Sequence, residues 1–352
     1  MMPGVISRLY RGDINIDFVG KRKIWYGLSA FLLVFSIVGL IVNNGLNLGV
    51  EFRGGSVFDF ARTPTSSVES VRATMSDAGV HQIIVQEAGT ANWRVTTESL
   101  TTTQVSEVQQ AVATEYGIAK NQVSSQVIGA TWGGEVSEKA VIGLIVFMVA
   151  IMLYLTIAFE WQMALAAIVA LVHDLVITAG VYAWSGFEVT PATMLGFLTI
   201  LGYSLYDAVV VFDMIKEVTG KLGTSAKMTY TQAANNALSH TLIRSLNTSL
   251  VAILPVAAIL FIGTTLLGAG TLKDLSLALF VGMLVGTYSS ICVATPILVS
   301  LKEREPQWQA LARRVAQREA SEAKQATSKT TTKTTAKAKT EPVGAAKAKP
   351  KK

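Results

Sequence analysis

Long apolar segments constrain this chain more than any other feature. Six of them are each about 18 residues or longer, which is the length that an α-helix needs to cross a hydrocarbon core about 30 Å thick. Of the 352 residues, 51% are hydrophobic and only 15% are charged. The sequence therefore predicts a polytopic α-helical membrane protein with six transmembrane helices, at 24–43, 140–158, 163–184, 191–213, 246–267 and 274–301.

The basic residues predict one orientation for these helices, because Lys and Arg favour cytoplasmic loops. The first apolar segment is too long for the core of a signal peptide and lacks a small-residue cleavage site, so we interpret it as an uncleaved signal anchor. The loop at 185–190 has Glu188 and no basic residue, which places it outside. Residues 1–23 and 302–352 are both predicted to be cytoplasmic. Outside the tail, the basic residues that support this orientation lie before the first apolar segment and after the fourth: Arg8, Arg11, Lys21, Arg22, Lys23, Lys216, Lys221 and Lys227.

A polar stretch at 44–138 lies between the first helix and helices 2 to 6, which occupy 139–301. Four of its segments alternate apolar and polar residues, and two others repeat apolar residues every three or four positions. Ser66 or Ser67 is the expected N-cap of the first of these helices, and Gly79 its end. The order β-α-β-β-α-β predicts a small ferredoxin-like extracytoplasmic α+β domain. Its strands are expected at 47–61, 81–89, 92–99 and 121–132, and its helices at 66–79 and 102–117.

The net charge of +6 comes from the C-terminal tail. Residues 302–352 contain 14 Lys or Arg and 5 Glu, which leaves −3 for the other 301 residues. The basic balance therefore does not indicate a nucleic-acid-binding domain, and no sequence-specific nucleic-acid partner is expected. The tail is low in complexity and has few large apolar residues, so it is predicted to be disordered. Its lysines suit anionic membrane lipids or ribosomal RNA.

The chain lacks the motifs of cofactor-dependent and metal-dependent enzymes. It has no phosphate-binding loop, no GxGxxG motif and no His/Cys cluster with metal-ligand spacing. The single cysteine, Cys292, cannot form an internal disulfide. His81 has no acidic or cysteine cluster around it and is interpreted as a surface histidine. We therefore expect no catalytic residues, no metal and no cofactor, with protons as the coupling ion.

Ionisable residues within the apolar segments are the candidates for function, because a charge inside a bilayer is costly. His173 and Asp174 lie near the middle of the third segment, Asp207 lies in the fourth, and Arg244 precedes the fifth. Asp207 is about six residues from Asp213 at the inner boundary, or roughly 9 Å deep. The Arg244 side chain enters from the same side and is long enough to reach Asp207 if the two helices are adjacent.

These groups suit a proton relay in which the charge of Asp207 changes during the transport cycle. Polar neighbours that would hydrogen-bond the carboxylate or hold water are Tyr203, Ser204, Ser245, Asn247, Thr248 and Ser249. Structural roles remain open. Asp207 and Arg244 would form a permanent ion pair, His173 and Asp174 a hydrogen-bonded pair between helices, and Asp213 a helix end at the interface.

Several segments resemble the SecF family of protein-export membrane subunits, in the resistance-nodulation-division superfamily. The stretch at 202–217 reads GYSLYDAVVVFDMIKE and is similar to the family's fourth-span motif, GYSLNDTVVVFDRIRE. Further family motifs resemble VEFRGGSVFDF at 50–60, LVHDLVIT at 171–178, IRSLNTSL at 243–250 and FVGKRKIWY at 18–26. The resemblance covers about residues 1–301, and the tail lies outside it.

The resemblance implies a function in the bacterial cytoplasmic membrane. A SecF subunit pairs with SecD, associates with the SecYEG channel, with SecA and YajC nearby, and uses the proton-motive force to help preproteins complete translocation. The family's functional carboxylate falls on Asp207 and its arginine on Arg244. The chain departs from the family pattern at Glu51, Tyr206, Ala208, Met214 and Lys216.

Two other functions remain as alternatives. A proton-driven exporter of lipids or small molecules in the same superfamily would need a larger external module with an apolar binding pocket. A scaffold subunit without a proton role would tolerate the loss of the Asp207 carboxylate.

Overall fold

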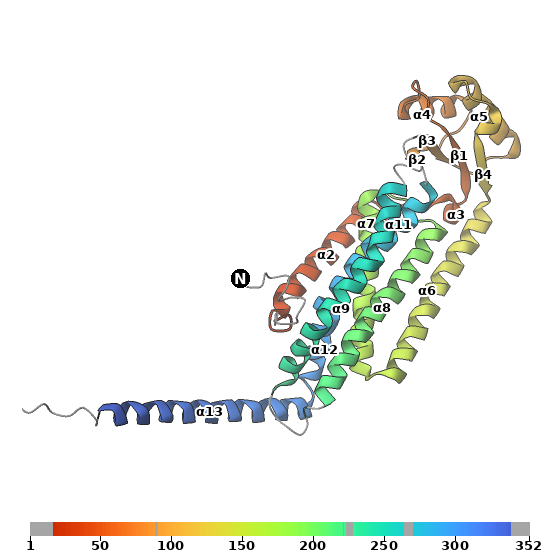
Figure 1. The fold of residues 1–352 in the computed structure, drawn as a ribbon. Helices are drawn as coiled ribbons and strands as arrows, with labels where there is room; N and C mark the ends of the chain where they lie inside the picture. The colour runs from red at the N-terminus through yellow and green to blue at the C-terminus, as the bar shows by residue number, and fades with distance from the viewer. Residues whose placement is uncertain (1–16, 89–90, 221, 223–227, 264–269, 339–352) are drawn as a thin grey trace, which may run out of the picture.

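The computed structural model describes residues 17–88, 91–220, 222, 228–263 and 270–338. Figure 1 shows a bundle of long helices with a small α/β domain at one end and a single projecting helix at the other. Four of the predicted cytoplasmic basic residues, Arg8, Arg11, Lys221 and Lys227, lie outside the described residues. The same is true of the last part of the tail, 339–352.

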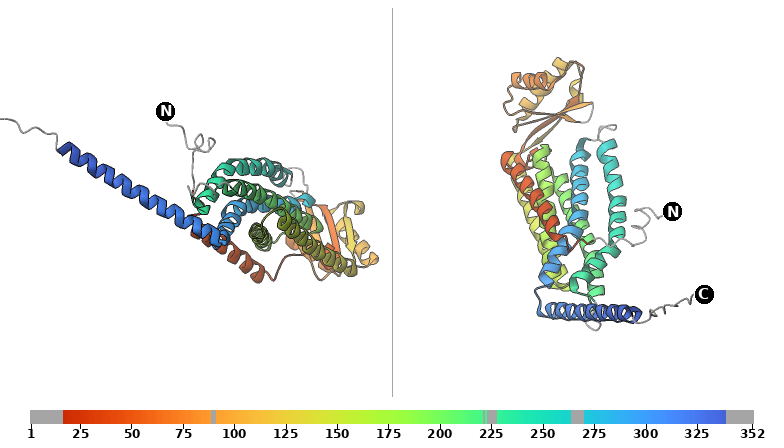
Figure 2. Two further views of the ribbon diagram at one scale, coloured as in Figure 1. Left: turned by 90° about the horizontal axis from the view of Figure 1, so that it is seen from below. Right: turned by 90° about the vertical axis from the view of Figure 1, so that its left-hand side faces the viewer.

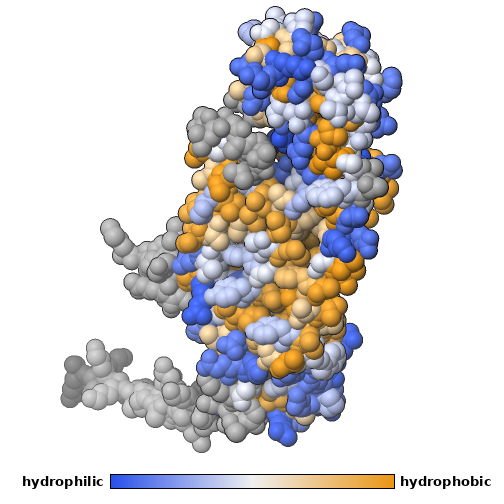
Figure 3. Space-filling view, turned by 90° about the vertical axis from the view of Figure 1, so that its right-hand side faces the viewer, coloured by the Kyte–Doolittle hydropathy of each residue, from blue (hydrophilic) through white to orange (hydrophobic). Residues whose placement is uncertain are grey.

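Within the described residues, six helical segments are long and apolar enough to cross a membrane, as predicted. An apolar belt covers the visible face of the bundle between two hydrophilic ends (Figure 3). The spans are α2 (Arg22–Val42), α6 (Ala130–Ala158), α7 (Trp161–Ser185), α8 (Pro191–Gly220), α9 (Tyr230–Ala258) with the π-helical η3 (Ile259–Gly263), and α11 (Gly270–Ser289) with the π-helical η4 (Ser290–Ala294) and α12 (Thr295–Lys302).

Two helices extend well beyond the apolar segments that predicted them. Helix α8 continues to Gly220, and α9 already begins at Tyr230, so most of the stretch between the predicted fourth and fifth spans is helical. The start of α9 is fixed by a capping box between Thr229 and Gln232. Hydropathy misses these turns because they rise out of the hydrocarbon and carry polar residues. As a result, Arg244 lies in the middle of its helix and not at its start.

Small residues let α8 and α11 approach closely, as is common between helices in membranes. A β-carbon added to Gly286 of α11 would lie 3.0 Å from the Cβ of Ser204 on α8. One added to Gly196 of α8 would lie 3.1 Å from the Cβ of Ala278 on α11. This contact brings the hydroxyl residues of α11 and η4 against the carboxylates of α7 and α8.

The α+β domain lies between α2 and α6 in the chain, and its four strands form one antiparallel sheet in the order β2-β3-β1-β4. Phe58 of β1 pairs with Val95 of β3, and both are fully buried under α4 and α5. Ser67 is the N-cap of α4, as one of the two expected candidates. The elements are β1 (Gly55–Ala61), α4 (Val68–Asp77), β2 (Ile84–Ala88), β3 (Asn92–Thr97), α5 (Thr102–Tyr116), the 3₁₀ turn η1 (Lys120–Gln122) and β4 (Ser124–Ile128).

The prediction of one strand across 47–61 is wrong at its start. A short helix, α3 (Val50–Arg53), comes first, and positive φ follows at Gly54 and at Gly55, the first residue of β1. The helix is favoured because it buries Phe52 against α7 and α8 at the base of the domain. The last predicted strand is also too long, since β4 ends at Ile128 and α6 starts at Ala130. Glycine is required at 133, where a β-carbon would lie 2.8 Å from the Phe52 carbonyl oxygen.

The loop between α7 and α8 joins the α+β domain to the bundle. The Val189 N–H donates to the Asn47 carbonyl at 2.7 Å, and the Gly49 N–H donates to the Val189 carbonyl at 2.9 Å. Glu188 of this loop is buried near Arg94 of β3 and Asp274 of α11. Burial raises the pKa of the Glu188 carboxyl, the negative charge of Asp274 raises it further, and Arg94 partly offsets both.

The prediction of a disordered tail is wrong for residues 306–338, which form helix α13 (Pro306–Ala338). Its first turns contain apolar residues three and four positions apart, Trp308, Leu311 and Val315, which pack on the first turns of α9. Helix-forming residues such as Ala, Gln, Glu and Arg fill the positions between them. The prediction treated the tail as one low-complexity segment and so overlooked the regular spacing of these apolar residues.

The raised pKa of Glu188 predicts a pH-dependent contribution to stability. A carboxyl with a raised pKa favours folding in acid, and this contribution is lost as the pH rises through the folded pKa. The variant Glu188→Gln cannot ionise. We therefore expect the melting temperature of the variant, relative to that of the wild type, to rise as the pH increases from about 4 to about 8. Glu115→Gln, on the exposed side of α5, is the control and should follow the wild type. A difference in melting temperature between Glu188→Gln and the wild type that stays constant with pH would contradict this explanation.

Candidate functional site

Two carboxylates are buried at the centre of the helical bundle. Asp174 lies near the middle of α7 and has no exposed surface, and Asp207 lies near the middle of α8 and is 5% exposed. Each is surrounded by hydroxyl side chains from neighbouring helices. Polar groups at this depth mark candidate sites for ion or proton pathways.

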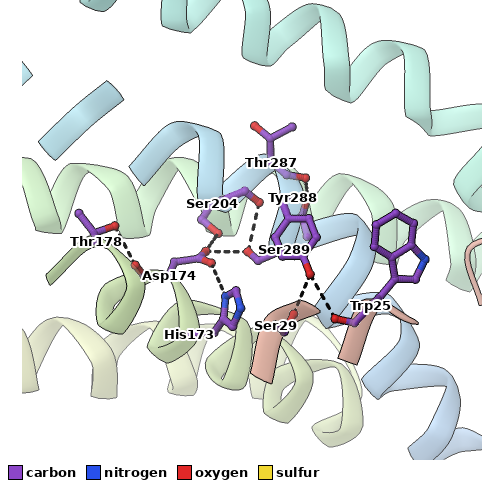
Figure 4. A network of polar contacts seen from close by, with 11 residues as sticks. Trp25, Ser29, His173, Asp174, Thr178, Ser204, Thr287, Tyr288 and Ser289 are labelled. Carbon is purple, nitrogen blue, oxygen red and sulfur yellow. Dashed lines mark hydrogen bonds and ion pairs between the residues drawn. The ribbon is translucent and has the colours of Figure 1, made fainter. Parts of the chain in front are cut away.

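Asp174 is held by three side chains (Figure 4). The hydroxyls of Ser204 and Ser289 donate to its Oδ2 at 2.6 and 2.7 Å. His173, the preceding residue, places Nδ1 3.1 Å from Oδ1. The other ring nitrogen of His173 is buried and has no hydrogen-bond partner in the described part of the chain. This set joins α7, α8 and α11 in the middle of the membrane.

The network extends towards α2 through Tyr288. The Tyr288 ring centroid lies 6.1 Å from that of His173. Its hydroxyl makes a hydrogen bond of 2.8 Å with that of Ser29 and also donates to the Trp25 carbonyl at 3.3 Å (Figure 4). Hydrogen bonds of Tyr288 therefore join α11 to α2 beside the Asp174 site.

Asp207 is held by two serines on different helices. Ser245 of α9 donates to Oδ1, and Ser290 of η4 donates to Oδ2. A second layer supports them, since the Ser249 hydroxyl donates to the Ser245 carbonyl at 2.8 Å and the Thr287 hydroxyl donates to that of Ser249 at 2.7 Å. All the side-chain hydrogen bonds described for Asp207 therefore come from hydroxyls.

Adjacent serines connect the two carboxylates. Ser289 donates to Asp174 and Ser290 to Asp207, although consecutive residues of an α-helix point about 100° apart. The π-helical turn η4 begins at Ser290. Single π turns within α-helices are frequent at functional sites, because they widen the helix and redirect side chains. Here the turn starts where one helix contacts both acids.

The predicted contact between Arg244 and Asp207 is wrong for this structure. Arg244 is exposed on the outside of the bundle, and it takes part in none of the ion pairs found among the described residues. The rotation of α9 explains the difference, because Ser245 faces Asp207 and consecutive residues of an α-helix point about 100° apart. Asn247 and Thr248 are exposed on the same part of α9.

The remaining predicted residues divide between the two sides of the helices. Ser249 is buried beside the Asp207 site, whereas Ser204 contacts Asp174 and not Asp207. The Tyr203 hydroxyl is buried and has no hydrogen-bond partner within the described residues. Tyr206, the residue that replaces asparagine in the family motif, is 61% exposed. Asp213 is exposed near the C-terminal end of α8.

Sequence reasoning did not find the hydroxyls of the sixth span. Thr287, Ser289 and Ser290 all take part in the two sites, but none is ionisable. Their signal in the sequence is the run TYSS at 287–290, where four hydroxyl residues interrupt an apolar segment. No group of three or more His, Cys, Asp or Glu able to hold a metal occurs among the residues that the structure describes.

Comparison with known proteins gives consistent matches. Residues 108–304 match the family "Protein export membrane protein SecD/SecF, C-terminal", and residues 39–65 match the "SecD/SecF GG Motif". The protein translocase subunit SecF of Streptomyces coelicolor is 47% identical over 317 residues, which cover 90% of this chain and 85% of the relative. SecF of Mycobacterium tuberculosis is 40% identical, over 90% of this chain and 74% of the relative.

A solved structure is similar along most of the chain. The crystal structure of SecDF from Thermus thermophilus, a translocon-associated membrane protein, superposes with a TM-score of 0.76 at 30% sequence identity. The match covers 83% of this chain and 39% of the longer protein. This chain therefore corresponds to about two fifths of that SecDF polypeptide.

The Asp174 network predicts how two substitutions will differ. Asp174→Ala leaves the buried hydroxyls of Ser204 and Ser289 without their acceptor, and an unsatisfied buried group costs about 1–3 kcal/mol. We expect this variant to lose about that much stability, measured by thermal melting in detergent. Asp174→Asn keeps an acceptor oxygen and should lose much less. Equal losses for the two variants would contradict a role for these hydrogen bonds.

Proposed function

The chain belongs to the SecD/SecF family of protein-export membrane proteins and is an auxiliary subunit of the Sec translocase; on that premise we propose that it works with SecD to couple the proton-motive force to translocation. In this proposal, protons enter from outside and leave on the cytoplasmic side, and preproteins are helped to complete their passage across the cytoplasmic membrane. Both termini lie in the cytoplasm. The domain between α2 and α6 is ferredoxin-like, which the sheet order β2-β3-β1-β4 supports. It faces the outside in this proposal.

The observation that carries this proposal is the hydroxyl environment of Asp207. A serine hydroxyl can donate to an ionised carboxylate, and it can accept from a protonated one. Ser245 and Ser290 therefore accommodate both charge states of the acid. An arginine in contact would hold the carboxylate ionised. The absence of an ion pair at Asp207, within the described residues, favours a reversible proton carrier over the permanent ion pair.

Asp174 is the second acid of the proposed relay. Ser289 donates to Asp174, and the next residue, Ser290, donates to Asp207. A change in the charge of one carboxylate therefore alters the hydrogen bond of a serine that is adjacent in the chain to the serine bonded to the other carboxylate. Protonation of Asp207 reverses the Ser290 hydrogen bond at the start of η4. We propose that this turn is the element that converts the charge change into a shift of α11 and α12.

The external domain is placed to receive such a shift. The loop between α7 and α8 is bonded to Asn47 and Gly49 at the base of the domain. The Tyr182 hydroxyl of α7 donates to the Asp274 carbonyl of α11. A movement of α11 against α7 therefore reaches both the loop and the domain, which would bias an emerging polypeptide outwards.

The exposed polar surface of α9 supports SecD as the partner. Arg244, Asn247 and Thr248 lie outside the bundle in the middle of a long membrane-spanning helix. Such residues in a bilayer almost always face another protein segment or water. We propose that SecD covers this surface and supplies an acidic partner for Arg244. Association with the SecYEG channel, SecA, YajC and the preprotein is part of the same proposal and is supported only by the family resemblance.

The proton role predicts a specific effect of Asp207→Asn. The amide keeps the size and the hydrogen bonds of the side chain but cannot exchange a proton. We expect export of a secreted reporter to lose nearly all of its dependence on the proton gradient, while membrane levels of the protein stay normal. Asp213→Asn, on the exposed cytoplasmic end of the same helix, is the matched control and should behave as wild type.

Three outcomes separate the functions considered. Gradient-dependent export that survives Asp207→Asn would support a scaffold without a proton role. Loss of lipid or dye efflux, with normal export, in a strain that lacks the protein would support the exporter. Loss of gradient-dependent export in Asp207→Asn alone supports the proton-coupled export subunit.

The partner surface predicts a cross-link. A cysteine introduced by Thr248→Cys, in a protein whose native cysteine is removed by Cys292→Ala, should react with SecD through a short bifunctional reagent. Val149→Cys, exposed in the middle of α6, is the control and should give little adduct. Equal adduct yields at the two positions, or none at 248, would contradict the proposed SecD surface.

A further inference from the structure

Helix α6 stands at the edge of the bundle and is held near both of its ends. Figure 1 shows it beside α8, and Figure 2 shows the α+β domain over one end of the bundle and α13 across the other. At the domain end, Gly133 lies against the Phe52 carbonyl oxygen, and the Ser137 hydroxyl donates to the same oxygen at 3.4 Å. In the other half of the helix, Ile151 and Leu155 are buried in the core of the bundle.

A charged contact fixes the turn that follows α6. Glu160, which comes shortly after the end of α6 at Ala158, pairs with Lys302 at the end of α12. Lys302 is 3% exposed and also pairs with Glu305. Both ends of α6 are therefore tied to the rest of the protein. The space that the middle of α6 leaves beside α8 is thus shaped by the fold itself.

This space is an apolar groove in the half of the bundle nearest the α+β domain. Its volume is about 470 Å³, which is within the range of about 300–1,000 Å³ typical of ligand pockets. Apolar side chains from three helices line it: Phe52 of α3, Val136 and Ala140 of α6, and Met194, Leu195 and Leu198 of α8. A ligand of this groove therefore has an apolar body.

Gly143 of α6 also lines the groove, and the position of its missing side chain is open space. A β-carbon added there would meet no atom within 4 Å. Glycine in a membrane helix commonly lets another helix approach closely, as Gly286 does against Ser204. Gly143 instead widens the groove. The space is therefore available to a molecule from the surrounding membrane.

Two opposite charges border the groove on the side of the α+β domain. Glu135 and Lys139 are four positions apart in α6, so they share one face of the helix, and both line the groove. Both are exposed, and neither takes part in an ion pair among the residues that the structure describes. Lys139 directly precedes the apolar segment 140–158, so the pair lies at the level of the lipid headgroups. Trp132, which also lines the groove, is of a type enriched at this level.

The groove and its charges together suit a phospholipid with a zwitterionic headgroup. An acyl chain matches the apolar lining, a phosphate matches Lys139, and an amine matches Glu135. Ile142 and Ile145, on either side of Gly143 in the chain, are exposed and apolar. Contacts between membrane helices favour small or polar residues at such positions. This part of α6 is therefore better suited to lipid than to the helix of a partner protein.

We propose that the groove between α6 and α8 binds one molecule of phosphatidylethanolamine. An acyl chain lies along Gly143, the phosphate lies against the Lys139 ammonium, and the headgroup amine donates to the Glu135 carboxylate. The lipid fills the space beside the half of α8 nearest the α+β domain, in the helix that carries Asp207. Its binding does not depend on the proton role of that acid.

Native mass spectrometry of the full chain, released from detergent in the presence of defined lipids, tests this proposal. With equal amounts of three phospholipids, we expect one tightly held phosphatidylethanolamine, bound about tenfold more tightly than phosphatidylglycerol or phosphatidylcholine. Phosphatidylglycerol has no amine, and the choline group has no N–H to donate to Glu135. Glu135→Gln should therefore remove the preference. Lys139→Gln should weaken the binding of all three lipids, because each carries a phosphate.

Matched variants show whether the groove itself is responsible. Glu138→Gln removes an exposed acid of α6 that does not line the groove, and it should keep the preference. Gly143→Leu fills the groove and should abolish tight binding. Gly27→Leu, at another exposed helical glycine with open space around an added β-carbon, should leave binding unchanged. Neither glycine variant should lower the melting temperature, which separates lost binding from unfolding.

Any of three results would overturn the proposal. Equal affinity for the three lipids would remove the headgroup recognition by Glu135. Tight binding of phosphatidylethanolamine that survives Gly143→Leu would place the lipid outside the groove. A photoreactive amino acid at position 195 that cross-links in cells to a polypeptide, and not to lipid, would assign the groove to a protein segment.

Discussion

The account depends on a carboxylate in the membrane whose hydrogen-bond partners are hydroxyls. Asp207 accepts from Ser245 and Ser290, which lie on different helices and can reverse their hydrogen bonds when the acid is protonated. A cation in the same place would favour one charge state. The site is therefore suited to change its charge without leaving a buried group unsatisfied, and this property is what a proton-coupled export subunit needs.

Close packing of the helices brings the two acids and their hydroxyl partners together. Glycines at 196 and 286 allow α8 and α11 to lie close together, and the π turn at Ser290 begins where one helix meets both acids. At the outer end, the loop with Glu188 connects the bundle to the sheet domain. At the inner end, the buried Lys302 and its glutamates fix where the last span stops. The proposed proton site thus lies between two fixed ends, and a shift at its centre has a defined path to each.

The sequence was most informative where a single physical rule decides the structure. Bilayer thickness sets span length, so the six helices could be predicted, and strict alternation of residues revealed most of the sheet. The rule fails at α9, because its first turns are polar and hydropathy starts the helix too late. Hydropathy also does not show which way a side chain faces, so it could not reveal that Ser245, and not Arg244, faces Asp207. The short helix at Val50 was missed because tertiary burial of Phe52 outweighs the alternating pattern. Ser289 and Ser290 were missed because only the fold shows that they face the acids.

The most direct test of the central claim is the protonation state of Asp207 itself, read by infrared difference spectroscopy of the reconstituted protein during a pH titration. The account predicts a carboxylic acid band that appears and disappears reversibly with pH and is absent from Asp207→Asn. It also predicts that Ser245→Ala and Ser290→Ala move the frequency of that band, because these hydroxyls bond to the acid. A spectrum in which no band assigned to Asp207 changes across the range where the protein stays folded would contradict the account.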